Sequence, residues 1–377
     1  MSQGQTSIAV AVKNPVRPAL IVDRSTLKSY AVLLRHLLTG LADEPCPAAI
    51  ICPPDADVGN ILCPSVELIR HPILKIPLFR TQNSKILFDK LEKFKPSVLH
   101  CLSGSKARLT VRIATHLDIP YVLTFNALQR SLFRPRLCPS HCADLIASSE
   151  VIADYLVKVY SRLSGRIEQI NIGVFVDDTC ACFSETSRVT SMVTAKTLDR
   201  LSDFEPLLNA VRHLAIDGYE FIYAIVGSGP AERQIHELIK GLGLSQLVTI
   251  IPAIDPIRTL FAGADIFIQP RPAAEFDSCL LEAMSVGTAV ATARGGIDDL
   301  LIEDRTAVFF DPDDELRIYS ALQKLFDQHD FARQLALTGQ IHLRKHYSVS
   351  RMVDALIQTY RNAQQWYKAQ LSYEAEK

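Results

Sequence analysis

Short apolar segments alternate with longer amphipathic segments along the whole of this 377-residue sequence. This alternation is typical of repeated β-α units, in which each buried strand is followed by a helix that covers the sheet. Strands are expected at 18–22, 48–52, 97–101, 121–124, 144–147 and 167–173, and then at 221–226, 248–251, 265–269, 289–292 and 307–310. The expected fold class is therefore α/β, with parallel sheets.

Stretches with helical spacing of apolar residues lie between the expected strands. The first is expected to have Ser25 as its N-cap and Gly40 near its end. Two helices, at about 314–327 and 349–370, are expected to close the chain. Residues 174–190 show no period and separate two β-α series. The sequence thus predicts two Rossmann-like doubly wound domains with a cleft between them, 1–175 and 176–350, and a C-terminal helix, 351–377, that packs back on the first.

The net charge of the chain is close to zero, with 40 Lys and Arg against 41 Asp and Glu. No overall basic field is present to attract nucleic acid, so nucleic acid is not an expected partner. The balance differs between the halves: residues 1–185 carry 21 basic and 16 acidic side chains, and residues 186–377 carry 19 and 25. The two halves are expected to present different surfaces.

Neither a membrane-spanning segment nor a secretory signal is recognisable. No apolar run reaches the roughly 18 residues that a spanning helix needs, and residues 1–17 lack the charged-then-apolar layout of a signal peptide. We expect a cytoplasmic protein.

The nine cysteines form no C-x-x-C pair, and Cys138, His141 and Cys142 are too crowded for a convincing zinc site. No metal and no cofactor is expected.

Several segments of the second half have the composition of anion and nucleotide sites. The expected strand 221–226 runs into a turn with Gly227 and Gly229, which permit close backbone approach, although a tight turn without a ligand has the same pattern. A further strand ends at Gln269, and a helix is expected to begin after Ser278 as its cap. In an open α/β sheet, ligands bind at this carboxyl edge.

The loop and helix after Gln269 carry the candidate ligand contacts. Free N–H groups at Ser278, Cys279 and Leu280 could accept a diphosphate. Glu282 could accept hydrogen bonds from ribose hydroxyls, because neighbouring apolar residues fill the core positions; a carboxylate that merely complements the helix dipole is the alternative. Arg271 could bind phosphate or acceptor, or remain solvated. The paired Gly295 and Gly296 also permit close approach to a ligand.

Together these segments resemble a known family. Val226-Gly-Ser-Gly-Pro, Leu281-Glu-Ala-Met-Ser-Val-Gly-Thr-Ala-Val-Ala-Thr, Gly295-Gly and Asp311-Pro-Asp-Asp look like the donor-binding domain of family 4 retaining glycosyltransferases of the GT-B fold, the glycosyl transferases group 1. The resemblance is strong over about residues 190–350. It is weaker but ordered over 1–189, through Pro96-Ser-Val-Leu-His, Ile119-Pro-Tyr-Val-Leu-Thr, Ala143-Asp-Leu-Ile-Ala-Ser-Ser-Glu and Asn171-Ile-Gly-Val.

The resemblance implies two facing Rossmann-like domains and a hexosyltransferase-like activity of the kind used in polysaccharide biosynthesis. A nucleotide sugar, such as a UDP- or GDP-sugar, would bind the C-terminal domain. A glycan or lipid-linked acceptor would bind the N-terminal domain, and transfer would retain the anomeric configuration without an obligatory metal. The donor-binding residues would be Gly227, Gly229, Arg271, Ser278, Cys279, Glu282, Gly295 and Gly296.

The sequence departs from the family pattern at several positions. The first carboxylate of the family's E-x7-E pair would fall on Ala274, and Glu275 lies one position later. The basic pair that neutralises the donor diphosphate would fall on Thr197 and Ser202, and Lys196 and Arg200 are close enough to substitute for it. Glu275, Lys196 and Arg200 are therefore candidate catalytic residues.

In the first half, Asp23-Arg-Ser-Thr26 replaces the family's glycine-rich loop, and Leu102 and Asn126 stand where histidines are usual. His100, at the end of an expected strand, is a further catalytic candidate that faces the cleft, or a histidine satisfied inside the sheet edge. These departures leave two functions open: a working transferase, and a catalytically silent homologue that binds nucleotide sugars or acts as a scaffold. An epimerase or phosphorylase is less favoured, because no lysine suited to a pyridoxal cofactor stands out.

Basic and apolar residues are interleaved between Arg70 and Lys95. The basic members are Arg70, His71, Lys75, Arg80, Lys85, Lys90, Lys93 and Lys95. Each basic residue near an anionic membrane surface contributes about 1 kcal/mol of attraction. The stretch predicts either peripheral contact with the inner face of a membrane or a solvated basic face.

Overall fold

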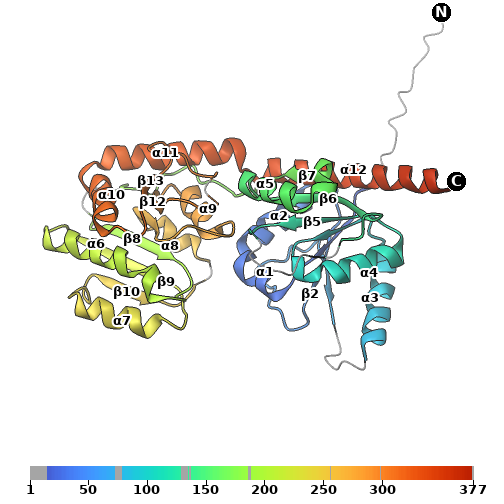
Figure 1. Ribbon diagram of the computed structural model, residues 1–377, viewed down its shortest axis with the longest axis horizontal. Helices are drawn as coiled ribbons and strands as arrows, with labels where there is room; N and C mark the ends of the chain where they lie inside the picture. Colours follow the sequence, from blue (N-terminus) through green and yellow to red (C-terminus); the bar gives the residue numbers. More distant parts are fainter. Residues whose placement is uncertain are drawn as a thin grey trace, which may run out of the picture.

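The computed structural model describes residues 15–72, 79–128, 135, 137–185, 188–254, 256–297 and 299–375. Two α/β domains lie side by side, and the final helices run along both of them (Figure 1). Each domain is built on one parallel sheet, as the alternation of apolar and amphipathic segments predicts.

The first domain contains a seven-stranded parallel sheet in the order β3-β2-β1-β4-β5-β6-β7. Its strands are β1 (Pro18–Ile21), β2 (Ala49–Cys52), β3 (Glu67–Arg70), β4 (Val98–Cys101), β5 (Tyr121–Phe125), β6 (Cys142–Ala147) and β7 (Ile167–Gln169). The helices are α1 (Arg24–Ser29), α2 (Ala31–Asp43), α3 (Arg80–Phe94), α4 (Ala107–Leu117) and α5 (Glu150–Val159). Leu20 of β1 pairs with Ile50 on one side and His100 on the other. Every residue of β1, β2 and β4 is buried, which explains their continuous apolar runs.

The second domain contains a six-stranded parallel sheet in the order β10-β9-β8-β11-β12-β13. Its strands are β8 (Thr190–Ala195), β9 (Phe221–Val226), β10 (Val248–Ile251), β11 (Ile266–Gln269), β12 (Ala289–Ala293) and β13 (Val308–Phe310). The helices are α6 (Glu205–Ile216), α7 (Glu232–Gly241), α8 (Arg258–Ala262), α9 (Ser278–Ser285), α10 (Glu315–Asp327) and α11 (His329–His346). The last helix, α12 (Val349–Ala375), packs on the first domain. The strand order reverses between β8 and β11, so the loops that leave these two strands lie side by side at the carboxyl edge.

The first helical segment differs from the sequence-based expectation. Asp23, rather than Ser25, is its N-cap, because the Asp23 carboxylate accepts a 2.8 Å hydrogen bond from the Thr26 N–H. The segment is also broken at Tyr30, which separates α1 from α2. Gly40 lies within α2, where a Cβ would come within 2.6 Å of Val353 in α12. Gly40 lies in the last turn of α2, as expected, and it permits the close packing of α2 against α12.

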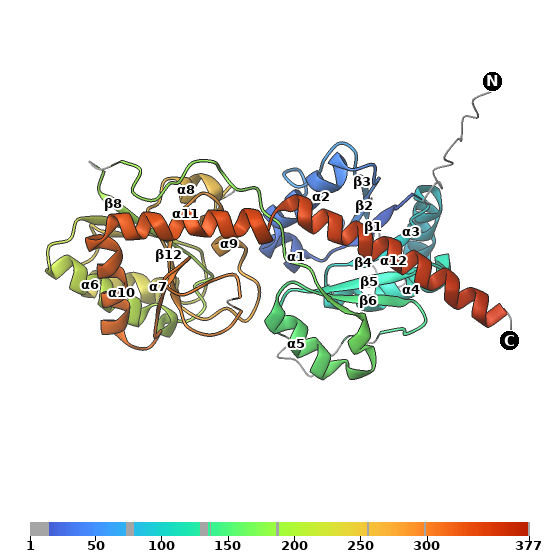
Figure 2. The ribbon, with the colours of Figure 1, turned by 90° about the horizontal axis from the view of Figure 1, so that it is seen from above.

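The long helix α12 returns from the second domain to the first. From above, α11 lies over the second domain and α12 continues across the first (Figure 2). The chain crosses between the domains at two adjacent points, where the Val174 N–H donates to the Tyr347 carbonyl oxygen at 2.8 Å. Tyr360 of α12 is fully buried against the first sheet.

The two domains also contact each other at their facing loops. The Leu128 N–H donates to the Ala274 carbonyl oxygen at 2.9 Å, and the Phe276 N–H donates to the Asn126 carbonyl oxygen at 2.7 Å. These bonds join the loop after β5 to the loop after β11, so the carboxyl edges of the two sheets face each other.

Candidate active site

A cleft of about 810 Å³ lies where the strand order of the second sheet reverses. We call it the switch-point cleft. Its walls are the loop after β8, residues 195–203, and the loop after β11, residues 271–278, together with Ser29, Tyr30, Ala127 and Leu128 of the first domain. From the two neighbouring strands, β8 and β11, the chain continues in opposite directions along the sheet, and open α/β sheets bind ligands in the crevice formed at such a position.

The cleft brings together the three basic residues that the sequence singled out, although their surroundings differ. Arg271 is mostly buried and paired with Asp313, and it also lies 3.8 Å from Asp203. Arg200 is exposed and forms a 3.2 Å ion pair with Asp203. Within the described part of the chain, the Lys196 side chain makes neither an ion pair nor a hydrogen bond. Lys196 is therefore the cation most available to a ligand.

Four carboxylates share the switch-point cleft with these cations, namely Asp199, Asp203, Glu275 and Asp277. Glu275 is exposed, and its backbone forms an antiparallel bridge with Ala127 of the first domain. One of its carboxylate oxygens, Oε2, lies 3.5 Å from the Tyr30 hydroxyl group, which donates toward it. The charged lining is thus mixed, and a phosphate would meet acidic as well as basic side chains.

The N-terminus of α9 is closed by the protein itself, contrary to the sequence-based expectation. We expected Ser278 to cap this helix and the N–H groups of Cys279 and Leu280 to be free. Asp277 is the N-cap instead: its Oδ1 accepts the Cys279 N–H at 2.9 Å and the Leu280 N–H at 3.1 Å. The Ser278 hydroxyl group donates to the Ser29 carbonyl oxygen of the first domain at 3.0 Å. A diphosphate at this helix end would have to replace the Asp277 carboxylate.

Glu282 lies beside a second interdomain cleft of about 390 Å³, which we call the α9 cleft. The expectation that Glu282 would point away from the protein interior is wrong, because its side chain is 0% exposed. Its Oε2 forms a 2.9 Å ion pair with Arg258, which in turn binds Asp177 at 2.7 Å. Burial raises the pKa of Glu282, and Arg258 partly offsets that increase.

The other carboxylate oxygen of Glu282 is unsatisfied. Among the described residues Oε1 has no hydrogen-bond partner, and the unpartnered Nδ1 of His36 lies 3.7 Å away across the domain interface. Burial lowers the pKa of His36 to about 4, with Arg35 and Arg258 adding to the effect. His36 is therefore neutral near pH 7, and Oε1 of Glu282 is a buried acceptor without a donor among the described residues.

The candidate glycines pack closely against the protein's own backbone. A Cβ on Gly227 or Gly229 would overlap the carbonyl oxygen of Lys196 or Leu198, so both glycines let the turn after β9 pack against the loop after β8. Gly296, at φ +87°, lies against Ala273 in the same way. The close approach predicted from these glycines is real, but its partners are the loops of the switch-point cleft.

Gly295 is the exception among these glycines. It has a φ of +92°, and a Cβ there would touch only Pro272 at 3.9 Å. Its left-handed backbone conformation, which favours glycine, is therefore the main reason for this residue type at the turn.

His100 is a buried structural histidine, the second of the two alternatives. Its Nδ1 lies 2.6 Å from the Tyr360 hydroxyl oxygen and its Nε2 lies 2.6 Å from the Thr124 hydroxyl oxygen. Burial lowers the pKa of His100 to about 3, so the ring is neutral near pH 7. Both nitrogen atoms already have partners, which leaves His100 without a free atom for proton transfer.

The sequence patterns did not identify three residues of the site. Asp277 stands next to Ser278, and either residue type makes a good N-cap, so the sequence could not rank them. Arg258 is distant in sequence from Glu282, and no periodic pattern connects the two. Tyr30 counts as an ordinary apolar position of a continuous helix until the break at that residue is seen.

In the described part of the chain, no group of three or more His, Cys, Asp or Glu side chains could hold a metal ion. No helix in that part is long and apolar enough to cross a membrane.

Solved structures with similar architecture identify the fold as GT-B. A glycosyltransferase from Rickettsia africae superposes with a TM-score of 0.77 at 17% identity, covering 93% of this chain and 99% of that one. Anabaena HepE, solved in complex with UDP-glucose, gives a TM-score of 0.73 at 14% identity, covering 91% and 98%. Both superpositions cover more than nine-tenths of this chain and therefore include both of its α/β domains.

Sequence comparisons show a further likeness, at the level of sequence, in the second domain. Residues 189–340 match the family model of the glycosyl transferases group 1. The sulfoquinovosyl transferase SQD2 of Arabidopsis thaliana is 26% identical over 275 residues, which are 64% of this chain and 51% of that protein. The chain spans about half or less of the length of the curated relatives it matches, with 51%, 32% and 43% for three of them. The matched segment includes both loops of the switch-point cleft and all of α9.

Proposed function

We propose that this protein is a glycosyltransferase that moves a sugar from a nucleotide diphosphate donor to a glycan or lipid-linked acceptor, with retention of the anomeric configuration. The match of residues 189–340 to the group 1 glycosyltransferases supports the class of reaction. The UDP-glucose complex of a protein with the same fold supports a nucleotide sugar as donor. No cofactor or metal is part of this proposal.

The observation that carries the proposal is the unsatisfied Oε1 of Glu282 beside the α9 cleft. An unpaired buried acceptor costs about 1–3 kcal/mol, so its persistence in a fold suggests a partner that is supplied on binding. The hydroxyl groups of a ribose are donors of the right kind. Ser278 and Cys279 line the same cleft and the adjacent switch-point cleft begins at Ser278, so a nucleoside and its diphosphate could extend from one cleft into the other.

The basic residues of the switch-point cleft would then stabilise the departing diphosphate. As the bond between the sugar and the diphosphate breaks, negative charge grows on the phosphate oxygens, and fixed cations at that point are usually a large catalytic contribution. Lys196 has no competing partner among the described residues, and Arg200 could exchange Asp203 for phosphate because its side chain is 74% exposed. Arg271, held by Asp203 and Asp313, would position the loop after β11.

A second function, a catalytically silent homologue that binds nucleotide sugars or acts as a scaffold, has specific support. The Asp277 carboxylate occupies the N–H groups at the start of α9, and it would repel an incoming diphosphate. Two of the three cations in the switch-point cleft are already paired with carboxylates. A silent homologue would bind nucleoside and release no diphosphate.

The acceptor side of the proposal includes peripheral contact with an anionic membrane through α3. Lys85 and Lys93 are exposed on this helix, and Arg112 of α4 joins it through a 2.7 Å hydrogen bond to Ser84. Lys75, which belongs to the predicted basic stretch, lies outside the described residues. A basic helix at the edge of the acceptor-side domain would bring a lipid-linked acceptor to the cleft.

Calorimetric titration of nucleotides and nucleotide sugars tests the proposal at its base. Binding of a nucleoside diphosphate that is weakened in Glu282→Gln is the expected result. No binding by any nucleoside diphosphate or nucleotide sugar would rule out the transferase and the nucleotide-sugar-binding homologue, and would leave the scaffold.

A further inference from the structure

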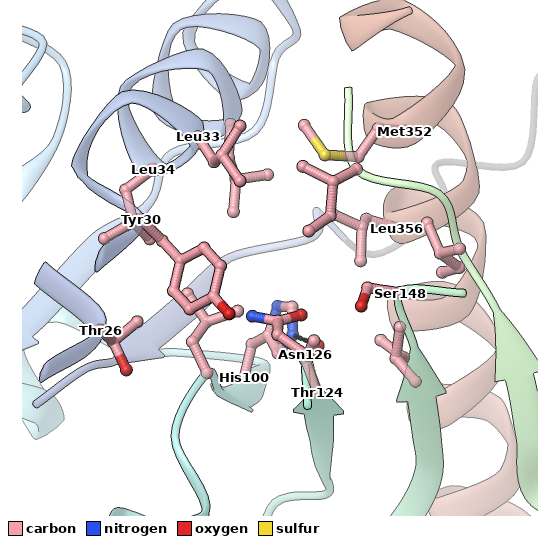
Figure 3. A pocket seen from close by; sticks show the side chains of 15 residues that line it. Thr26, Tyr30, Leu33, Leu34, His100, Thr124, Asn126, Ser148, Met352 and Leu356 are labelled. Atoms are coloured by element: carbon pink, nitrogen blue, oxygen red, sulfur yellow. Dashed lines mark hydrogen bonds between the residues drawn. The ribbon is translucent and has the colours of Figure 1, made fainter. Parts of the chain in front are cut away.

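An apolar pocket lies between α2, α12 and the sheet of the first domain (Figure 3). Helix α2 supplies Leu33 and Leu34 to its upper wall, and α12 supplies Met352 and Leu356. The carboxyl ends of β4, β5 and β6 form its floor. It is lined mainly by aliphatic side chains, which favour a hydrocarbon group over water.

The floor of the apolar pocket is polar but carries no charge. His100 and Thr124 bond to each other there, and the second ring nitrogen of His100 is taken by Tyr360. Because burial holds the pKa of His100 at about 3, the imidazole stays neutral at physiological pH. A charged group would therefore find no counter-charge on the floor, whereas a hydrocarbon group has no polar atoms to desolvate.

The pocket and the switch-point cleft share one lining residue. Tyr30 lines both cavities, and its hydroxyl group reaches Glu275 at 3.5 Å. Asn126 stands at the same place, and its side-chain oxygen has no hydrogen-bond partner among the described residues. The next two residues after Asn126, Ala127 and Leu128, line the switch-point cleft. A ligand could thus place a hydroxyl group at Asn126 and an apolar group behind it.

The size of the pocket limits what it can hold. Its accessible volume is about 60 Å³. Since one water-sized group needs about 10–15 Å³ on this measure, the pocket has room for about four to six methylene-sized groups. A second sugar ring with its hydroxyl groups would not match the aliphatic walls, and a long hydrocarbon chain would not fit.

We propose that this pocket binds a short hydrocarbon group, of about four to six carbons, that belongs to the acceptor. The inference rests on the proposed function, because it assigns the first-domain side of the switch-point cleft to the acceptor. The apolar group enters past Tyr30, and an adjoining hydroxyl group of the acceptor donates to the Asn126 side-chain oxygen. The pocket thereby selects acceptors with an apolar portion next to the hydroxyl group near the cleft.

Titration with n-alkyl glucosides from methyl to dodecyl, each below its critical micelle concentration, tests the inference without the donor. Each methylene buried should tighten binding about fourfold, the equivalent of about 0.8 kcal/mol. The gain should stop at about four to six carbons, where the pocket is full. Affinity that does not change with chain length, or that rises steadily to dodecyl, would overturn the inference.

Two opposite changes at Leu34 separate a filled pocket from a general loss of structure. Leu34→Ala enlarges the pocket and should move the plateau to chains two or three carbons longer. Leu34→Phe fills it and should move the plateau to shorter chains. If Leu34→Ala does not unfold cooperatively, Leu356→Ala provides the same enlargement from α12. A plateau that stays in place in both directions would contradict the assignment.

The same proteins distinguish this inference from the proposed function. Nucleoside diphosphate binding is measured in each variant, because Leu34 does not line either interdomain cleft. A chain-length plateau without nucleotide binding would leave the apolar pocket in place and refute the proposed function. Nucleotide binding without a chain-length effect would refute the apolar pocket alone.

Discussion

The carboxylate of Asp277 places a negative charge at the N-terminus of α9. This carboxylate accepts two backbone N–H groups and also the Gln269 side-chain amide at 2.8 Å. An intramolecular carboxylate in this position competes with any phosphate for the same donors. The balance between the two proposed functions therefore depends strongly on this residue.

Replacing Asp277 with glycine should expose the helix N-terminus. Glycine costs only a few tenths of a kcal/mol as an N-cap, and the lost bond to Gln269 adds about 1 kcal/mol of destabilisation. Nucleoside diphosphate binding should tighten about tenfold, since two N–H groups become free and one negative charge is removed. Calorimetric titration measures the affinity.

Asp314→Gly is the matched control for that substitution. Asp314 caps α10 in the same manner, accepting the N–H groups of Leu316 and Arg317. Asp314 lines neither interdomain cleft. An equal gain in affinity in both variants, or no gain in Asp277→Gly, would contradict competition between Asp277 and phosphate.

Glu282 and Arg258 form an ion pair whose two ends are expected to behave differently. Glu282→Gln and Arg258→Gln both break the pair, and each should lower the free energy of unfolding by about 2 kcal/mol or more, because one buried partner is left alone. Only Glu282→Gln weakens the acceptor for a ribose hydroxyl group, so only this change should weaken nucleoside binding, by about tenfold. Equal losses of affinity would show that Glu282 acts solely through the fold.

Residue types near the clefts could be predicted better than their partners. Lys196, Arg200, Arg271 and Glu275 all line the switch-point cleft, as expected for residues at the ends of strands β8 and β11. Glu282 was expected to have no structural role, yet its side chain is fully buried and forms an ion pair with Arg258. Helical periodicity places a residue on a face, but it does not show which distant side chain packs against that face.

At the scale of secondary structure, strands with continuous apolar runs were predictable, whereas β3, β8 and α11 were not. Strand β8 is almost wholly buried, but Thr190, Ser191 and Thr194 interrupt its apolar run. The edge strand β3 has only two apolar residues, Leu68 and Ile69, and of its four residues only Ile69 is buried. Helix α11 buries mainly small and scattered residues, among them Ala332, Ala336 and Gly339. These patterns are weak, because packing on a neighbouring element, rather than local hydrophobicity, determines these structures.

His100 links three elements, β4, β5 and α12, and should make stability depend on pH. Its pKa is about 3 in the folded state against an ordinary 6.5, so between these values the unfolded chain binds more protons. The contribution of His100 to the free energy of unfolding is fully present above pH 6.5 and is lost as the pH falls toward 3. Over pH 5.5 to 4 the loss is about 1.4 kcal/mol per pH unit.

In His100→Asn, the number of protons taken up on unfolding in this pH range should be smaller by about one. The variant will be less stable at every pH, because Tyr360 and Thr124 lose a partner. Its denaturation midpoints between pH 5.5 and 4 should nevertheless change less steeply than those of the original protein. His36 contributes to the same range in both proteins and cancels in the comparison. Parallel slopes would contradict a neutral buried His100.

Helix α3 is expected to bind anionic vesicles weakly and in a salt-sensitive manner. Reversing Lys85, Lys90 and Lys93 to glutamate should abolish co-sedimentation at low salt, because each basic residue contributes about 1 kcal/mol. The matched control reverses Arg212, Arg233 and Lys240, which are exposed on helices of the second domain. Absence of binding by the unmodified protein, or equal loss in both triple variants, would exclude membrane contact through α3.

At the scale of the whole molecule, two sheets with opposed carboxyl edges create the interdomain clefts. The likeness to GT-B structures extends over more than nine-tenths of the chain. The two-domain arrangement follows from the alternating sequence pattern, because each β-α series must close its own sheet. The facing of the two edges could not be read from either series alone, since it depends on contacts such as Phe276 with Asn126.

The central claim is that this protein transfers a sugar from a nucleotide diphosphate donor. The most direct test is release of nucleoside diphosphate from a panel of nucleotide sugars, measured beside Lys196→Ala/Arg200→Ala. We expect release from at least one donor above spontaneous hydrolysis. The double variant should abolish it and still bind the free nucleoside, because the lost cations act on the charge that develops on the diphosphate. Release that is unchanged in the double variant would contradict the role given to Lys196 and Arg200, and no release from any donor that binds would contradict the claim itself.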